Sequence, residues 1–148
     1  MKLRKVSKSN ISTLYELNFE LASEEGQRDL FTVSKEVYAE AFLSKNPILS
    51  GYILFNGSDA IGFYIYSFKF ASYIGSKVIY IEDIHLISNY RNLTNKLLLL
   101  KHAIDISSNE NCCRVELRML KSFNIGYEVV KSLGFEPVNK WEVYRLEK

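Results

Sequence analysis

The sequence of 148 residues predicts one domain of the α/β class, residues 1–148, in which strands and helices are mixed along the chain. Three observations lead to this prediction. Runs with alternating apolar residues, typical of strands, are interspersed with runs whose apolar residues are three or four apart, typical of helices. An Asn-Gly pair, the strongest short signal for a hairpin, separates two strand-like runs. An apolar strand-like run that ends at Leu86 leads directly into an apolar helix-like run.

The N-terminal part is expected to contain one short strand and two helices. Residues 3–6 alternate weakly and predict the strand. Apolar residues at helical spacing follow this strand and end near Gly26, since a glycine can terminate a helix. A second helix begins at Thr32 or Ser34, either of which can cap it, and Pro47 marks its end.

The middle of the chain is expected to form three strands and a long helix. Residues 51–55 and 60–70 lie on either side of the Asn-Gly turn and predict an antiparallel pair. The segment 77–101, KVIYIEDIHLISNYRNLTNKLLLLK, predicts a buried strand, a short loop and an apolar helix over about 93–108.

The C-terminal part is expected to add two strands and one helix. Residues 112–117 (CCRVEL) predict a strand, and residues 123–133 predict a helix that Gly134 ends. Residues 140–146 (KWEVYRL) alternate as a closing strand. The complete order of elements is therefore βααβββαβαβ.

Composition and charge argue against several classes of function. The net charge is +2 and the Lys and Arg residues form no stripe, so no nucleic-acid partner is expected. No apolar run approaches the roughly 18 residues of a membrane-spanning helix, and the N-terminal residues lack the apolar core of a signal peptide. We therefore expect a cytoplasmic protein with no membrane partner. His85 and His102 have no His or Cys partner at metal-ligand spacing, so no metal is expected.

Two acidic residues, Glu82 and Asp83, interrupt the apolar strand of the segment 77–101. Because successive strand side chains point to opposite faces, one of the two is expected to meet the interior or a cleft. A buried carboxylate is costly unless it is paired or used, so this pair is a candidate for chemistry. The strand also leads into a helix N-terminus, where unpaired amides and the helix dipole favour an anion.

The segment 60–91, AIGFYIYSFKFASYIGSKVIYIEDIHLISNYR, contains a hydrophobic-Gly-Phe strand, a Tyr-hydrophobic-Glu-Asp run and a Tyr-Arg pair. With these motifs, the order of elements and the C-terminal segments 132–135 and 141–146, the chain resembles the GNAT N-acetyltransferases, in particular their diamine (spermidine/spermine-type) branch. The resemblance implies the GNAT acyl-CoA acyltransferase fold, of the α/β (α+β) class. This fold has a mixed, mostly antiparallel sheet of six to seven strands flanked by about four helices, and the branch commonly forms homodimers.

The resemblance implies that acetyl-CoA is the co-substrate and lies between the strand ending at Leu86 and the strand starting at Cys112. Its pantetheine arm would bind the main chain of Ile84, His85 and Leu86. Asn124 is a loose match to the asparagine that often opens the last helix of the family. The pyrophosphate would rest on the amides of the loop formed by Arg91, Asn92, Leu93, Thr94, Asn95, Lys96 and Leu97.

The resemblance also assigns roles to four acidic residues. Glu82 matches the position of the base, acting through water, and Asp83 matches a position that faces a cationic substrate. Glu24 and Glu25 fall where this branch often has acids at the substrate mouth. The alternatives are that one of Glu82 and Asp83 caps a loop or pairs with a lysine, and that Glu24 and Glu25 lie in a solvated loop.

Two departures from the family pattern leave two functions open. Thr94 and Lys96 replace the two glycines of the phosphate loop, and Val130 holds the place of the tyrosine that protonates the leaving thiolate. Tyr127, one turn earlier on roughly the same face, could replace that tyrosine or be a packing residue. The first hypothesis is direct acetyl transfer to a primary amine of a small molecule, diamine or polyamine-like. The second is a catalytically impaired binding or interaction protein with the same fold.

Overall fold

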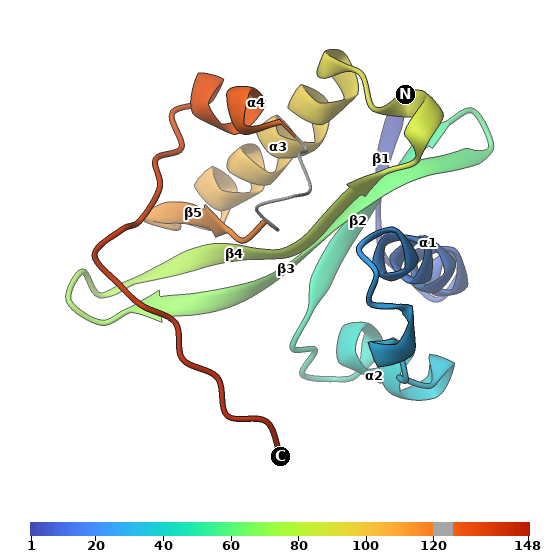
Figure 1. The fold of residues 1–148 in the computed structure, drawn as a ribbon, viewed down its shortest axis with the longest axis horizontal. Helices are drawn as coiled ribbons and strands as arrows, with labels where there is room; N and C mark the ends of the chain where they lie inside the picture. Colours follow the sequence, from blue (N-terminus) through green and yellow to red (C-terminus); the bar gives the residue numbers. More distant parts are fainter. Residues whose placement is uncertain (120–125) are drawn as a thin grey trace.

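The computed structural model describes residues 1–119 and 126–148, and one five-stranded sheet forms its centre (Figure 1). The strands are β1 (Lys2–Lys5), β2 (Ser50–Asn56), β3 (Asp59–Ala71), β4 (Ser76–Leu86) and β5 (Arg114–Leu117). They lie side by side in the order in which they follow along the chain. The pairs from β1 to β4 are antiparallel, and β4 pairs with β5 in parallel. The predicted mixed, mostly antiparallel sheet is confirmed.

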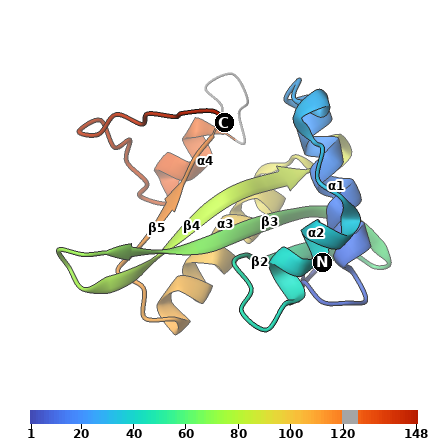
Figure 2. The same cartoon turned by 90° about the horizontal axis from the view of Figure 1, so that it is seen from below.

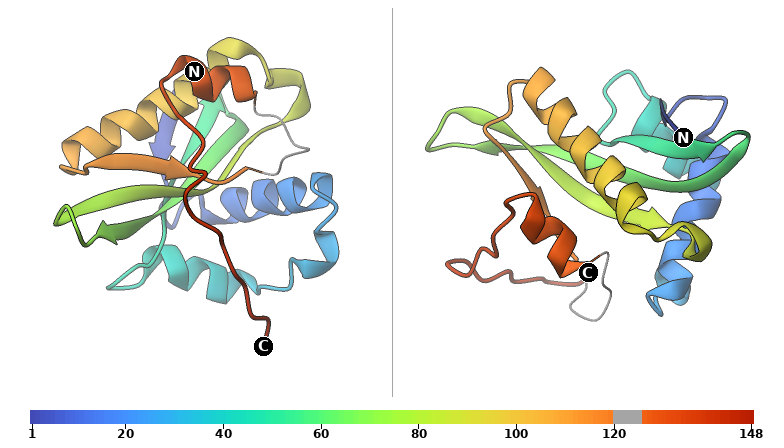
Figure 3. Two further views of the ribbon diagram at one scale, coloured as in Figure 1. Left: turned by 60° about the vertical axis from the view of Figure 1, so that its left-hand side comes forward. Right: turned by 90° about the horizontal axis from the view of Figure 1, so that it is seen from above.

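Helices cover both faces of this sheet. The part of the chain that the structure describes contains α1 (Ile11–Glu24), α2 (Lys35–Leu43), α3 (Leu93–Asn109), α4 (Tyr127–Ser132) and two 3-10 turns, η1 (Arg28–Leu30) and η2 (Ser88–Tyr90). In the left view of Figure 3, α1 and α2 lie on one face of the sheet and α3 and α4 on the other. Within residues 1–119 and 126–148, no helix has the length and apolar character needed to cross a membrane.

Local sequence signals explain where several of these elements begin and end. The Ser34 hydroxyl accepts a hydrogen bond from the amide of Val37 at 3.2 Å, so Ser34 caps α2. Gly26, with a φ of 70°, follows the end of α1. Gly57, with a φ of 62°, forms the turn between β2 and β3 that the Asn-Gly pair predicts.

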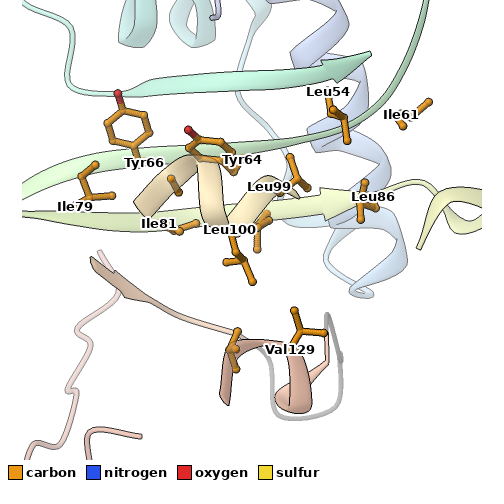
Figure 4. Close-up of a cluster of buried hydrophobic side chains, with 13 residues drawn as sticks. Leu54, Ile61, Tyr64, Tyr66, Ile79, Ile81, Leu86, Leu99, Leu100 and Val129 are labelled. Atoms are coloured by element: carbon orange, nitrogen blue, oxygen red, sulfur yellow. The ribbon is translucent and has the colours of Figure 1, made fainter. Parts of the chain in front are cut away.

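Two hydrophobic cores lie on the two faces of the sheet, and β3 contributes to both. Phe63 and Ile65 pack with α1 and α2, whereas Tyr64 and Tyr66 pack with α3 and α4. Figure 4 shows this second core, with Tyr64 between the sheet and Leu99 of α3. The Tyr64 hydroxyl lies 2.7 Å from Nδ1 of His102, so its polar end is satisfied within the core.

The C-terminal segment departs from the prediction. Residues 140–146 form no strand, and the side chains of Trp141, Val143, Tyr144 and Leu146 are exposed. In Figure 2 the chain after α4 runs away from the sheet. An alternating pattern stabilises a strand only when a neighbouring strand supplies hydrogen bonds and a covered face, and residues 1–119 and 126–148 supply neither to this segment. The described residues therefore form five strands, fewer than the six to seven expected.

Candidate functional site

A β-bulge in β4 determines how the two acidic residues are presented. Asp83 is paired with Ile65 and Ile81 with Tyr66, so Glu82 is an extra residue on β4. The residues of β4 that face α3 are Ile79, Ile81, Ile84 and Leu86. Glu82 and Asp83 both lie between Ile81 and Ile84, and both side chains point to the α1 face. The expectation that they point to opposite faces was wrong because the bulge interrupts the alternation.

Asp83 lies in a cavity of about 180 Å³ between β4 and the end of α1. Its walls are formed by Asn18, Leu21, Ala22, Glu25, Gln27, Leu30, Phe31, Asp83 and Arg118. Burial raises the pKa of the Asp83 carboxyl, Arg118 opposes this rise, and Glu82 adds to it. The cavity therefore presents a partly buried carboxylate whose charged form is disfavoured by burial.

Glu25 is the second acid of this cavity, and Arg118 is its cation. Burial raises the pKa of Glu25, the charge of Asp83 raises it further, and Arg118 lowers it. Arg118 directly follows β5, and its Nε donates to the main-chain oxygen of Glu82 at 3.4 Å. Sequence reasoning missed Arg118. The signal in the sequence was that Arg118 directly follows the predicted strand 112–117, which was expected to flank the acetyl-CoA site.

Glu82 lies beside the cavity and is held by the neighbouring strand. The Ser67 hydroxyl of β3 donates to Oε1 of Glu82 at 2.7 Å. This bond fixes the carboxylate on the same face as Asp83, where it can take a proton from a group bound next to it.

The end of β4 leaves one of its main-chain edges open toward β5. The pairing of β4 with β5 covers Val78 to Ile81 only, while β4 continues to Leu86. On the opposite edge, Ile84, His85 and Leu86 all pair with β3. A Cβ on Gly62 of β3 would lie 2.6 Å from the main-chain oxygen of His85, so glycine is required for this close approach. The pairing of the two middle strands thus ends at Ile81, opposite the last residue of β5, Leu117. The divergence of these strands that the resemblance implies stays a prediction.

Two asparagine side chains hold the loop after β4 through hydrogen bonds to its main chain. The Asn92 side chain accepts a hydrogen bond from the Asn95 amide at 2.9 Å and caps α3. Asn95 is itself buried and donates from Nδ2 to the main-chain oxygen of Tyr90 at 2.9 Å. Leu93 and Thr94 are exposed residues, and the first amides of α3 have no partner within the helix. Leu97 packs against the core, which leaves only its main chain near the loop.

Arg91 and Lys96 occupy different places around this loop. Arg91 donates from Nε to the main-chain oxygen of Leu86 at 2.6 Å and forms an ion pair with Glu24. Glu24 therefore binds the loop, whereas Glu25 lines the cavity. Lys96 is partly buried, and its Nζ lies near Gly126, where α4 begins.

His85 is a buried histidine on the α1 face, near Glu20 and Glu24. Its Nε2 lies 3.8 Å from a carboxylate oxygen of Glu20 and has no hydrogen-bond partner among the described residues. Burial lowers the pKa of His85 to about 4, with Glu24 opposing this effect and Arg91 adding to it. The ligand atoms of these three side chains lie within 4.8 Å of one another and could hold a metal ion. Because Arg91 already neutralises Glu24, we assign no metal to them.

The structure separates the two candidate positions for the proton donor on α4. Val130 is 6% exposed and belongs to the hydrophobic core that includes Leu99 and Leu100 of α3, so it can only be structural. Tyr127, at the first position of α4, is 49% exposed, and the Lys131 ammonium lies 5.8 Å from its ring centre. Asn124 lies outside the described residues.

Comparisons with known proteins were made on the sequence and on the fold. No family model matches the chain. Two curated relatives, the thialysine N-epsilon-acetyltransferases of Mus musculus and Bos taurus, are each 22% identical to it. The alignments cover 99% and 98% of this chain and 92% and 91% of the relatives.

Three solved structures illustrate the likeness of the fold. A probable acetyltransferase has a TM-score of 0.85 at 17% identity, covering 100% of this chain and 98% of its own. A predicted acetyltransferase from Clostridium acetobutylicum, solved with acetyl-CoA, has a TM-score of 0.78 at 16% identity, covering 97% and 95%. The aminoglycoside N-acetyltransferase AAC(6')-Iy in complex with CoA has a TM-score of 0.71 at 20% identity, covering 99% and 100%. The predicted GNAT fold is confirmed.

Proposed function

We propose that this protein is an N-acetyltransferase that moves the acetyl group of acetyl-CoA directly to a primary amine of a small molecule. The observation that carries the proposal is the acidic cavity around Asp83, which lies beside the open main-chain edge of β4. A cation site next to an edge that can bind an extended donor brings the two reactants together. The fold and the relatives that are N-acetyltransferases support the same function.

Acetyl-CoA would bind along the divergence of β4 and β5. Main-chain groups of Ile84, His85 and Leu86 would bind its pantetheine arm, because their second edge is not covered by β5. The amides of Leu93 and Thr94 at the start of α3 would bind its pyrophosphate, since they have no partners within the helix and both residues are exposed. Lys96 would add a point charge near these amides.

The chemistry would use residues on both sides of the divergence. An ammonium held by Asp83 or Glu25 would lose a proton to Glu82 through a water molecule, and the neutral amine would attack the thioester carbonyl. A C–N bond forms and the C–S bond breaks, so the sulfur leaves as a thiolate. Tyr127 would return a proton to that thiolate, and the second proton, which the nitrogen loses as the amide forms, would restore the Tyr127 hydroxyl through solvent. A diamine or polyamine is one class of acceptor, and a homodimer is the expected assembly.

A second function is favoured by the residues that replace family signatures. Thr94 and Lys96 add side chains where the loop of the family has glycines, and the buried Val130 cannot donate a proton. These changes favour a binding protein that has lost turnover.

Calorimetry with acetyl-CoA and CoA, followed by an assay of amine-dependent thiol release, separates the two functions. We expect both nucleotides to bind, and we expect thiol release with an acetylated amine identified by mass spectrometry. Absence of CoA binding at about millimolar concentration would overturn the proposed acetyltransferase function. Binding without turnover for any amine would favour the second function.

A further inference from the structure

One polar residue, Asn18, lies in the apolar stripe of α1 that packs on the sheet. The stripe is formed by the buried residues Leu14, Leu17 and Leu21, and Asn18 is four residues after Leu14, on the same face of the helix. A polar side chain in such a place costs stability unless it is hydrogen-bonded. Asn18 also lines the cavity that contains Asp83, so the groups that its amide binds decide what it does there.

The side chain of Asn18 connects α2 with the acid of the cavity. Its Nδ2 donates a hydrogen bond to the hydroxyl oxygen of Tyr38 on α2 at 3.1 Å. An asparagine Nδ2 carries two hydrogens, so one amide group can serve two acceptors. Asn18 also hydrogen-bonds to the carboxyl of Asp83, and this bond lowers the pKa of Asp83 because it favours the charged form.

Tyr38 gives this connection a fixed end. Its side chain is 7% exposed, and its ring centre lies 5.3 Å from that of Tyr15 and 5.2 Å from that of Phe42. Burial raises the pKa of the Tyr38 hydroxyl, which therefore stays protonated and uncharged at neutral pH. A packed aromatic ring with a neutral hydroxyl holds the Asn18 amide in one orientation without adding a charge next to the cavity.

We propose that Asn18 is a positioning residue, held by the Tyr38 hydroxyl, whose amide keeps the Asp83 carboxylate ionised and oriented to bind the ammonium group of the acceptor amine. This inference rests on the proposed function, in which Asp83 is a cation site. Burial and the charge of Glu82 both favour the protonated form of Asp83, which binds no cation. The other groups near Asp83 that carry a charge or can titrate are Glu25, Arg118 and Tyr38.

Titration of the Asp83 carboxyl, followed by NMR of the 13C-labelled side chain, tests the inference without any ligand. Asn18→Leu keeps the approximate shape of the side chain and fits the apolar stripe, but it donates no hydrogen bond. We expect the pKa of Asp83 to rise by about one unit or more, because a hydrogen bond to a charged group is lost. In Tyr38→Phe, which removes the anchor and leaves the amide, the pKa should rise by less. Asn109→Leu, the same change at the exposed end of α3, should leave it unchanged.

Calorimetry of putrescine binding at several pH values, without acetyl-CoA, tests whether this contact serves a cation. Affinity should fall as Asp83 takes up its proton, and in Asn18→Leu this fall should begin at a higher pH than in the wild type. A melting temperature equal to or above that of the wild type would show that Asn18→Leu is folded.

Three results would overturn the inference. They are an unchanged pKa of Asp83 in Asn18→Leu, an equal rise in Asn109→Leu, and the absence of putrescine binding to the wild type. A merely structural Asn18 would change the melting temperature and leave the pKa of Asp83 and the pH profile of binding in place. Failure of the proposed function has a different signature, the absence of acetyl-CoA binding and of thiol release while the effect of Asn18→Leu on Asp83 remains.

Discussion

Glu82 and Asp83 are neighbours in β4, yet both side chains lie on the face of the sheet that α1 covers, because Glu82 is the extra residue of a β-bulge. The two carboxylates differ in their surroundings. Asp83 lines the cavity, where burial raises its pKa, and Glu82 accepts a hydrogen bond from Ser67 outside the cavity lining. A cation site and a candidate base are thereby placed side by side, and the two can be tested separately.

Replacement of Glu82 by glutamine should impair chemistry without impairing donor binding. Glu82→Gln keeps the shape of the side chain and an oxygen that can accept from Ser67, but it cannot take a proton. We expect kcat/KM to fall by about 10²–10⁴-fold, the usual contribution of a general base, with an unchanged Kd for acetyl-CoA. Steady-state kinetics and calorimetry provide the two measurements. Glu40→Gln, on the exposed side of α2, is the control and should leave both unchanged. Unaltered kinetics in Glu82→Gln would remove Glu82 from the mechanism.

Replacement of Asp83 by asparagine should weaken acceptor binding and stabilise the fold. Loss of the charge should raise KM for the amine by about tenfold or more, with a smaller effect on kcat. The pKa of Asp83 is raised in the folded state, so the folded state binds its proton more tightly than the unfolded state does. Stability is then lost as pH rises from the pKa of the unfolded chain through the pKa of the folded state, and the cost is present above the latter. Asp83→Asn should therefore have the higher melting temperature at pH 7 and lose this advantage toward low pH. A melting temperature of Asp83→Asn at pH 7 equal to or lower than that of the wild type would contradict the raised pKa of Asp83.

The periodic elements of this fold could be predicted from sequence, whereas the site geometry could not. The β2–β3 hairpin and α3 follow from the Asn-Gly turn and from apolar spacing, which are local properties. The bulge at Glu82 carries no local signal, because two adjacent polar residues fit either regular alternation or an insertion. Arg118 enters the cavity only through the parallel pairing of β5 with β4, a contact distant in sequence. The segment 140–146 has the alternation of a strand but, in the described part of the chain, no neighbour to pair with.

His85 should make the fold sensitive to pH between about 4 and 6.5. Its pKa is about 4 in the folded state and 6.5 in a solvated chain, so the unfolded state binds its proton first as pH falls. Stability from this residue is present above pH 6.5 and is lost toward pH 4, by up to about 3 kcal/mol. Relative to His85→Gln, the wild type should lose free energy of unfolding over this range. The nearby groups Glu20, Glu24 and Arg91 are the same in both proteins. Denaturant unfolding at pH 7, 5.5 and 4.5 measures the difference, and parallel curves for the two proteins would show that His85 does not titrate there.

Restoring a glycine at Thr94 should strengthen the binding of CoA. Thr94 is an exposed residue in the first turn of α3, at a position where the resemblance to the GNAT enzymes implies a glycine. Without the Cβ of Thr94 the phosphates can approach the amides of α3 more closely, so we expect the Kd for CoA to fall several-fold in Thr94→Gly. The helix should lose less than about 1 kcal/mol, because that cost of glycine is relative to alanine and threonine already carries part of it. Ser108→Gly, at an exposed and uncharged position near the other end of α3, is the control and should leave the Kd for CoA unchanged. Calorimetry with CoA and with 3'-dephospho-CoA measures the effect, and weaker binding in Thr94→Gly would show that the threonine itself contacts the nucleotide.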